Sequence, residues 1–145
     1  MSTFCAGLTT GAGYTSTLPA FALVGGANKR LKVREITICN TGAAAVALKG
    51  CRLSTAGTPG TAATTDKQSD PEEGQTLVGT LRNTYTSTAP TTAEGGKRIT
   101  LGAGATMVLG FPNGWTVPAV ANAGVGFLLD SGTAQALMVD VTWDE

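Results

Sequence analysis

The 145-residue sequence contains no histidine, and only 14% of its residues are charged. Without histidine, the chain lacks the commonest general base and the commonest metal ligand. Ten basic and ten acidic residues give a net charge of zero, so the basic surplus that supplies most nucleic-acid affinity is missing. The longest weakly polar run, residues 117–129, contains Pro118 and Asn122 and is too short to span a bilayer. We therefore expect no nucleic-acid partner and no membrane partner.

Residue types that carry catalysis are also scarce. The three cysteines, Cys5, Cys39 and Cys51, form no Cys-x-x-Cys pair, whereas a structural zinc site needs about four ligands. This odd, dispersed set favours free, buried thiols in a reducing compartment. A nucleophile would need a lysine or a carboxylate as its base, no Ser-x-x-Lys motif occurs, and no carboxylate pair stands out. The sequence predicts no enzyme, with no catalytic, cofactor-binding or metal-binding residue and no cofactor.

Two polar segments resemble ligand loops only superficially. The glycines at 95–96 precede Lys97, but Arg98 stands where a phosphate loop needs Ser or Thr. Residues 66–73 are acidic, but Pro71 occupies the position of the glycine in a calcium loop. We interpret the first as part of a turn or strand and the second as a solvated loop.

A small basic cluster comprises Lys29, Arg30, Lys32 and Arg34. Lys32 and Arg34 occupy alternate positions of an expected strand and so share one face. That face could meet an acidic partner, or it could be a solvated strand edge that discourages aggregation. The sequence leaves both interpretations open.

Small residues dominate what is present. The chain holds 24 Thr, 21 Ala and 20 Gly. Threonine favours strands, and the Leu-, Lys- and Glu-rich stretches typical of helices are missing. Such a composition indicates a β protein with many turns and a thin core. Its low charge favours burial of surface in an assembly of several copies.

Period-two alternation of apolar residues marks the strands. In residues 31–40, Leu31 and Val33 share one face and Ile36 and Ile38 the other, so we expect either a bulge near Arg34 and Glu35 or a strand that is covered on both faces. The last segment alternates four apolar residues with polar ones, and we expect these four to face the core: Leu137, Val139, Val141 and Trp143.

About eight such strands recur roughly every ten residues, with turn signals such as the Pro-Asn-Gly at 112–114 between them. This spacing predicts an all-β fold, an antiparallel sandwich or jelly roll. Residues 1–19 and 54–97 lack the alternation. We predict an extended N-terminal arm at 1–19 and one domain at 20–145, with a long irregular loop or arm at 54–97.

Several of these segments are similar to small jelly-roll proteins of tailed bacteriophage particles. The run Lys-Val-Arg-Glu-Ile-Thr-Ile-Cys-Asn-Thr-Gly at 32–42 resembles their first core strand and turn. The turn at 102–106, the strand that begins at Gly124 and the end at 141–145 are similar too. The resemblance covers residues 20–53 and 98–145, and it implies a non-enzymatic virion component of the capsid decoration, or cement, type.

The function expected from this resemblance is to bind the assembled capsid surface and stabilise the joints between capsomers. The implied partners are the major capsid protein and further copies of this chain in a homotrimer. The implied location is the capsid surface of the virion, after synthesis in the host cytoplasm. The alternative is a jelly-roll module of the tail or baseplate that is involved in attachment or in receptor or carbohydrate binding. A carbohydrate-binding sandwich, with Trp115, Tyr85 or Tyr14 as a stacking platform, is the third possibility.

Overall fold

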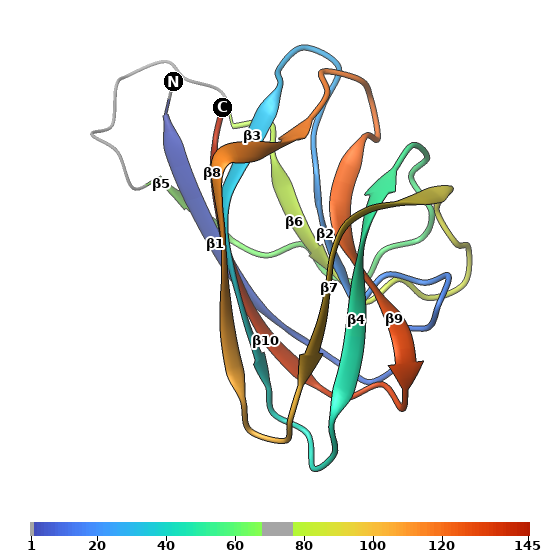
Figure 1. Cartoon of the computed structure of the whole chain (residues 1–145). Coiled ribbons are helices and arrows are strands. Elements are labelled where there is room, and N and C mark those ends of the chain that lie inside the picture. Colours follow the sequence, from blue (N-terminus) through green and yellow to red (C-terminus); the bar gives the residue numbers. More distant parts are fainter. Residues whose placement is uncertain (1, 68–76) are drawn as a thin grey trace.

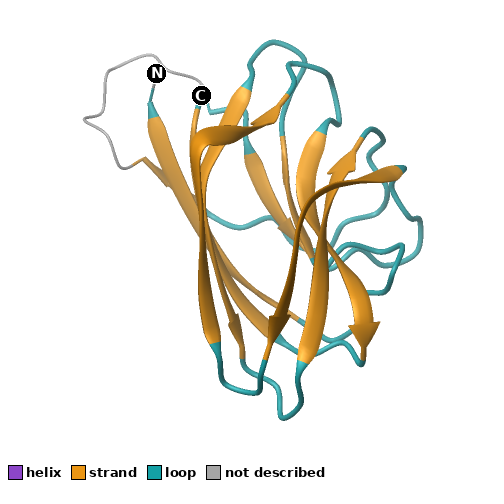
Figure 2. Ribbon diagram, viewed as in Figure 1, coloured by secondary structure: helices purple, strands orange, loops and turns teal. Residues whose placement is uncertain are grey.

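Two five-stranded antiparallel sheets pack face to face in the computed structural model, which describes residues 2–67 and 77–145 (Figures 1 and 2). No helix occurs in these residues, and the expected all-β sandwich is confirmed. The first sheet has the order β5-β1-β10-β3-β8 and the second the order β6-β2-β9-β4-β7. The strands are β1 (Thr3–Thr10), β2 (Phe21–Val24), β3 (Leu31–Asn40), β4 (Val46–Leu53), β5 (Thr65–Lys67), β6 (Thr80–Asn83), β7 (Thr92–Leu101), β8 (Thr106–Val117), β9 (Gly124–Gly132) and β10 (Leu137–Asp144).

Eight of the ten strands form a jelly roll. Folding the chain back on itself between β4 and β7 pairs β4 with β7, β3 with β8, β2 with β9 and β1 with β10. From β4–β7 to β1–β10, successive strand pairs of this folded-back chain lie alternately in the two sheets. This winding is the eight-stranded double Greek key. Ten strands are present instead of about eight because β5 and β6 add one strand to each sheet.

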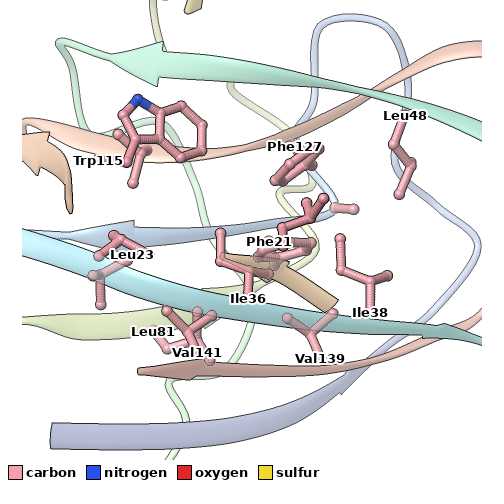
Figure 3. Close-up of a cluster of buried hydrophobic side chains, with 14 of the residues drawn as sticks. Phe21, Leu23, Ile36, Ile38, Leu48, Leu81, Trp115, Phe127, Val139 and Val141 are labelled. Atoms are coloured by element: carbon pink, nitrogen blue, oxygen red, sulfur yellow. The ribbon is translucent and has the colours of Figure 1, made fainter. Parts of the chain in front are cut away.

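The core lies between the sheets and consists of the inward half of each alternating strand. The four residues expected to face the core from β10, among them Val139 and Trp143, are at most 1% exposed. Figure 3 shows the side chains of Ile36 and Ile38 of β3 in the space between the sheets, where Phe127 of β9 also lies. The aromatic rings stack in pairs, including Phe21 with Phe127 at a centroid distance of 5.5 Å. The core therefore consists largely of aromatic and branched aliphatic side chains, even though the chain is rich in small residues.

Of the two arrangements expected for β3, the bulge is the one present. The pairing of β3 with β8 shifts between Val33 and Glu35, and on the β8 side residues 111–114 loop out of the ladder. The Pro-Asn-Gly sequence there does not separate two strands as expected. Instead, Gly114 adopts a φ of 73° and returns the chain to the same strand, so β8 is a single bulged strand.

The structure corrects the expectation of an N-terminal arm. Residues 3–10 are β1, which pairs along its whole length with β10, from Thr3 with Asp144 to Thr10 with Leu137. Phe4 and Ala6 are buried, each 4% exposed. The small and hydroxyl side chains conceal the alternation, and pairing with β10 supplies the stability that local propensity does not.

The segment expected to be a long irregular loop is also more regular than its sequence indicates. In its described part, residues 54–63 run antiparallel to residues 81–91. The Thr58 amide donates to the Thr88 carbonyl at 2.8 Å, and the Ala63 amide donates to that of Leu81 at 2.8 Å. Strands β5 and β6 pair with β1 and β2 (Figure 1). The insertion therefore covers sheet edges that would otherwise be open to aggregation.

Candidate functional site

The outer surface of the first sheet is not covered by any described segment, and we call it the open face. It consists of the outward residues of four neighbouring strands, which the register places in rows across the sheet. Most of them are small or hydroxyl-bearing. The open face comprises Cys5, Gly7, Thr9, Glu35, Thr37, Cys39, Thr106, Val108, Gly110, Met138, Asp140 and Thr142.

Two large apolar side chains stand on the open face. Val108 of β8 is 58% exposed and Met138 of β10 is 51% exposed. Met138 pairs with Cys39 of β3, and Val108 pairs with Thr37 on the same strand. Cys39 thus lies between the two, and three adjacent strands present apolar groups close together. Contiguous exposed apolar surface is a feature of interaction sites.

The charges of the open face lie beside this apolar centre. Asp140 extends over Gly7 of the neighbouring strand, so a side chain at Gly7 would collide with its carboxylate. This arrangement leaves a shallow groove of about 260 Å³ along β1 and β10. Glu35 lies opposite Thr142 and is exposed. The open face therefore has an apolar centre with two acidic groups, Asp140 and Glu35, beside it.

The basic cluster is partly used within the fold. Arg34 forms an ion pair through its Nε with Asp144, whose other oxygen accepts a hydrogen bond from the Thr3 hydroxyl at 2.8 Å. The Lys32 side chain lies against Gly114 in the β8 bulge. These contacts tie β1, β3 and β10 together and support a structural role for Arg34.

The second sheet is different, because its outer surface is partly covered by other segments. We call this the covered face. Tyr85 and Leu18, which lie outside the sheet, pack on outward residues of its strands, namely Ala22, Cys51, Leu53 and Leu128. The Tyr85 amide donates to the Pro19 carbonyl at 3.1 Å and so joins the two covering segments.

Ion pairs occupy the uncovered part of the second sheet. Arg98 of β7 donates to Asp130 and to Glu94, and Lys49 of β4 lies 3.4 Å from Glu94. The hydrogen bond to Asp130 is the main cause that raises the pKa of Arg98. These charges keep that region solvated.

The three cysteines divide between the two faces and remain free thiols. Cys5 and Cys39 lie partly exposed on the open face, whereas Cys51 is buried beneath the covering segments. Burial raises the pKa of Cys51 to about 12, against the opposing effects of the Gly126 backbone and the Lys49 charge. Within residues 2–67 and 77–145, no three His, Cys, Asp or Glu side chains gather as metal ligands would.

The aromatic side chains considered as sugar platforms are buried. Trp115, Tyr14 and Tyr85 are 7%, 2% and 0% exposed. Trp115 stacks on Phe111 within the sandwich, and the Tyr14 hydroxyl donates to the Gln135 carbonyl at 2.8 Å. None of the three offers a ring face to a sugar.

The acidic loop expected at 66–73 lies largely outside the described residues. Asp66 belongs to β5, whereas Asp70, Glu72 and Glu73 are not described. The glycines at 95–96 fall within β7 and are not part of a phosphate loop. The described chain contains no helix long and apolar enough to cross a bilayer.

No protein-family model matches the sequence, and no curated protein matches it. Two solved structures resemble the chain distantly: a mutant VP2 protein of infectious bursal disease virus at 11% identity, and a structure of the Gt strain of the same virus at 14% identity, each with a TM-score of 0.17. Each comparison covers 96% of this chain and 40% of the matched chain. At this level of similarity they carry no argument about the fold or the function.

Proposed function

We propose that this protein is a non-enzymatic structural component of a bacteriophage particle, of the capsid decoration type. It binds the assembled shell through the open face and stabilises the joints between capsomers. The observation that carries the proposal is the apolar centre of that face, with Val108 and Met138 more than half exposed. A flat sheet surface with short side chains orders few rotamers on binding, which lowers the entropic cost of docking.

The proposed mechanism is thermodynamic linkage. A protein that binds assembled capsomers but not separated ones shifts the equilibrium toward the assembled shell. A homotrimer, the oligomer proposed for this chain, would present three open faces at once. The second and third contacts then form at high effective concentration, so each interface can be weak.

Binding to shells that lack the protein tests the proposal. The Val108→Glu variant places a charge at the apolar centre of the open face, and Val120→Glu is its matched control. Both valines are 58% exposed, but Val120 lies in the loop between β8 and β9. Exposed substitutions change stability by only about 0.5 kcal/mol, so both variants should fold.

Co-sedimentation should show at least about a tenfold loss of shell affinity for Val108→Glu, a loss typical of a disrupted interface centre. Val120→Glu should bind as the unmodified protein does. Equal binding by all three proteins would contradict the use of the open face. A copy number in purified particles far below the number of capsomer joints would contradict the decoration role itself.

A further inference from the structure

A pocket of about 390 Å³ opens on the covered face, at the edge formed by β2 and β6. Its floor consists of Val24, Thr80 and Arg82. Thr80 pairs with Val24 across the two strands, and Leu81 between Thr80 and Arg82 points into the core. Thr80 and Arg82 therefore point outward into the space that the insertion overhangs.

The walls of the pocket come from distant parts of the chain. Pro59 and Tyr85 belong to the insertion, and Asn122 belongs to the loop between β8 and β9. Asn122 has a φ of 63°, in the left-handed region. Valine, proline and the Tyr85 ring supply apolar contact area, while Thr80, Arg82 and Asn122 supply hydrogen-bonding groups. A concave site with apolar walls and a few convergent polar groups is typical of ligand-binding sites.

Arg82 is the only cationic side chain among the described residues that line the pocket. No described carboxylate forms an ion pair with it, which is also true of other basic residues such as Arg52 and Lys97. The Tyr85 hydroxyl is buried without a hydrogen-bond partner and is not accessible to a ligand, so Tyr85 contributes only ring surface to the wall.

The guanidinium of Arg82 and the phenol of Tyr85 interact electrostatically. Burial raises the pKa of Tyr85 to about 12, and the positive charge of Arg82 opposes this rise. An acceptor that enters the pocket would therefore meet the Arg82 cation, with a neutral phenol nearby and no competing negative charge. Charge-assisted hydrogen bonds to such a cation are the strong ones.

We propose that this pocket binds a carboxylate carried on a short aliphatic stem. Arg82 acts as its counter-ion, the Thr80 hydroxyl donates to one of its oxygens, and Val24 and Pro59 contact the stem. A free dicarboxylate and a glutamate side chain of a partner polypeptide share this chemistry. The proposal does not depend on the decoration role, because the isolated protein suffices to test it.

Amide NMR titration of the isolated protein tests the site with two probes, glutarate and N-acetyl-glutamate methylamide. Each should produce saturable shifts at the amides of Gly25, Thr80 and Asn122, with a dissociation constant on the order of 1 mM, as expected for one charged contact. Glutaramide, which has the same stem and no charge, should not. Tighter binding of the methylamide would favour a partner side chain, and tighter binding of glutarate would favour a free ligand.

Four variants locate the binding. Arg82→Gln should weaken it at least about tenfold, the effect of removing a bond to a charged group. Thr80→Val, which keeps the size of the side chain and removes its hydroxyl, should also weaken it, whereas Tyr85→Phe should not, because the Tyr85 hydroxyl is buried. Arg52→Gln removes the same charge from an exposed residue outside the pocket and should have no effect. The proposal is overturned if neither probe saturates, or if Arg82→Gln binds as tightly as Arg52→Gln.

Discussion

The two outer sheet faces use similar strands in opposite ways. On the covered face, Leu128 points outward from a central strand but is only 3% exposed, because Tyr85 and Leu18 pack over its surroundings. On the open face, Met138 points outward from a central strand and is 51% exposed. The insertion and residues 11–20 therefore make a second small core on one side and leave the other side free for a partner.

The largest expected difference between the faces is in stability. Leu128→Gln buries an unpartnered amide and removes apolar contacts, and we expect it to lower the free energy of unfolding by about 3 kcal/mol. Met138→Gln, an equally conservative change in size, should alter it by less than about 0.5 kcal/mol. Urea unfolding of both variants measures the difference. Similar losses in the two proteins would mean that the faces are not covered differently.

The second largest effect is expected at alkaline pH, where buried groups of the covered face should lower the free energy of unfolding. The unfolded chain loses the protons of Cys51 and Tyr85 near pKa values of 9.0 and 10.0, whereas in the folded protein both pKa values are about 12. Deprotonation therefore favours the unfolded chain. Stability should be constant below pH 9 and then fall toward pH 12 by up to about 1.4 kcal/mol per pH unit for each group.

Urea unfolding across this pH range measures the slope. Cys51→Ala should remove the part of the loss that begins at pH 9. Tyr85→Phe should reduce the part that begins at pH 10, to which Tyr14 also contributes because burial raises its pKa. A slope that neither substitution changes would assign the alkaline loss to groups outside the covered face.

The smallest expected effect is a difference in stability between two variants, Tyr14→Phe and Tyr85→Phe, which each remove one buried hydroxyl. The Tyr14 hydroxyl bonds to both backbone groups of Gln135, at 2.8 and 3.1 Å, so Tyr14→Phe should destabilise the fold by about 1 kcal/mol. The Tyr85 hydroxyl has no partner, so Tyr85→Phe should be neutral or slightly stabilising. Thermal unfolding at pH 7 compares the two, and a greater loss for Tyr85→Phe would show that its hydroxyl is bonded in the folded state.

The sequence was sufficient to predict the strands whose apolar residues alternate. The inward faces of β3 and β10 follow from period two alone, and so does the bulge near Arg34 as one of two alternatives. Strand β1 was not predictable, because its threonines and glycines acquire a face only by pairing with β10. The covered face had one signal in the sequence: Phe127, Leu128 and Leu129 are consecutive, and such a run is typical of a strand buried on both sides.

The pocket had no comparable signal. Arg82 and Tyr85 lie three residues apart, but Val24 and Asn122 reach them only through the pairing of β2 with β6 and β9. Long-range pairing of this kind is set by the whole jelly roll and not by any local pattern. The open face is likewise visible only once the register aligns Met138 with Cys39.

Docking through the open face is tested most directly by the alkylation rate of Cys39, which lies at the centre of that face. In a Cys5→Ser background, Val120→Cys adds a reference thiol on the loop after β8, and alkylation rates are compared for free and shell-bound protein. We expect Cys39 to react in the free protein and to be protected on the shell, while the thiol at position 120 reacts equally in both. Equal reactivity of Cys39 in free and bound protein would contradict docking through the open face.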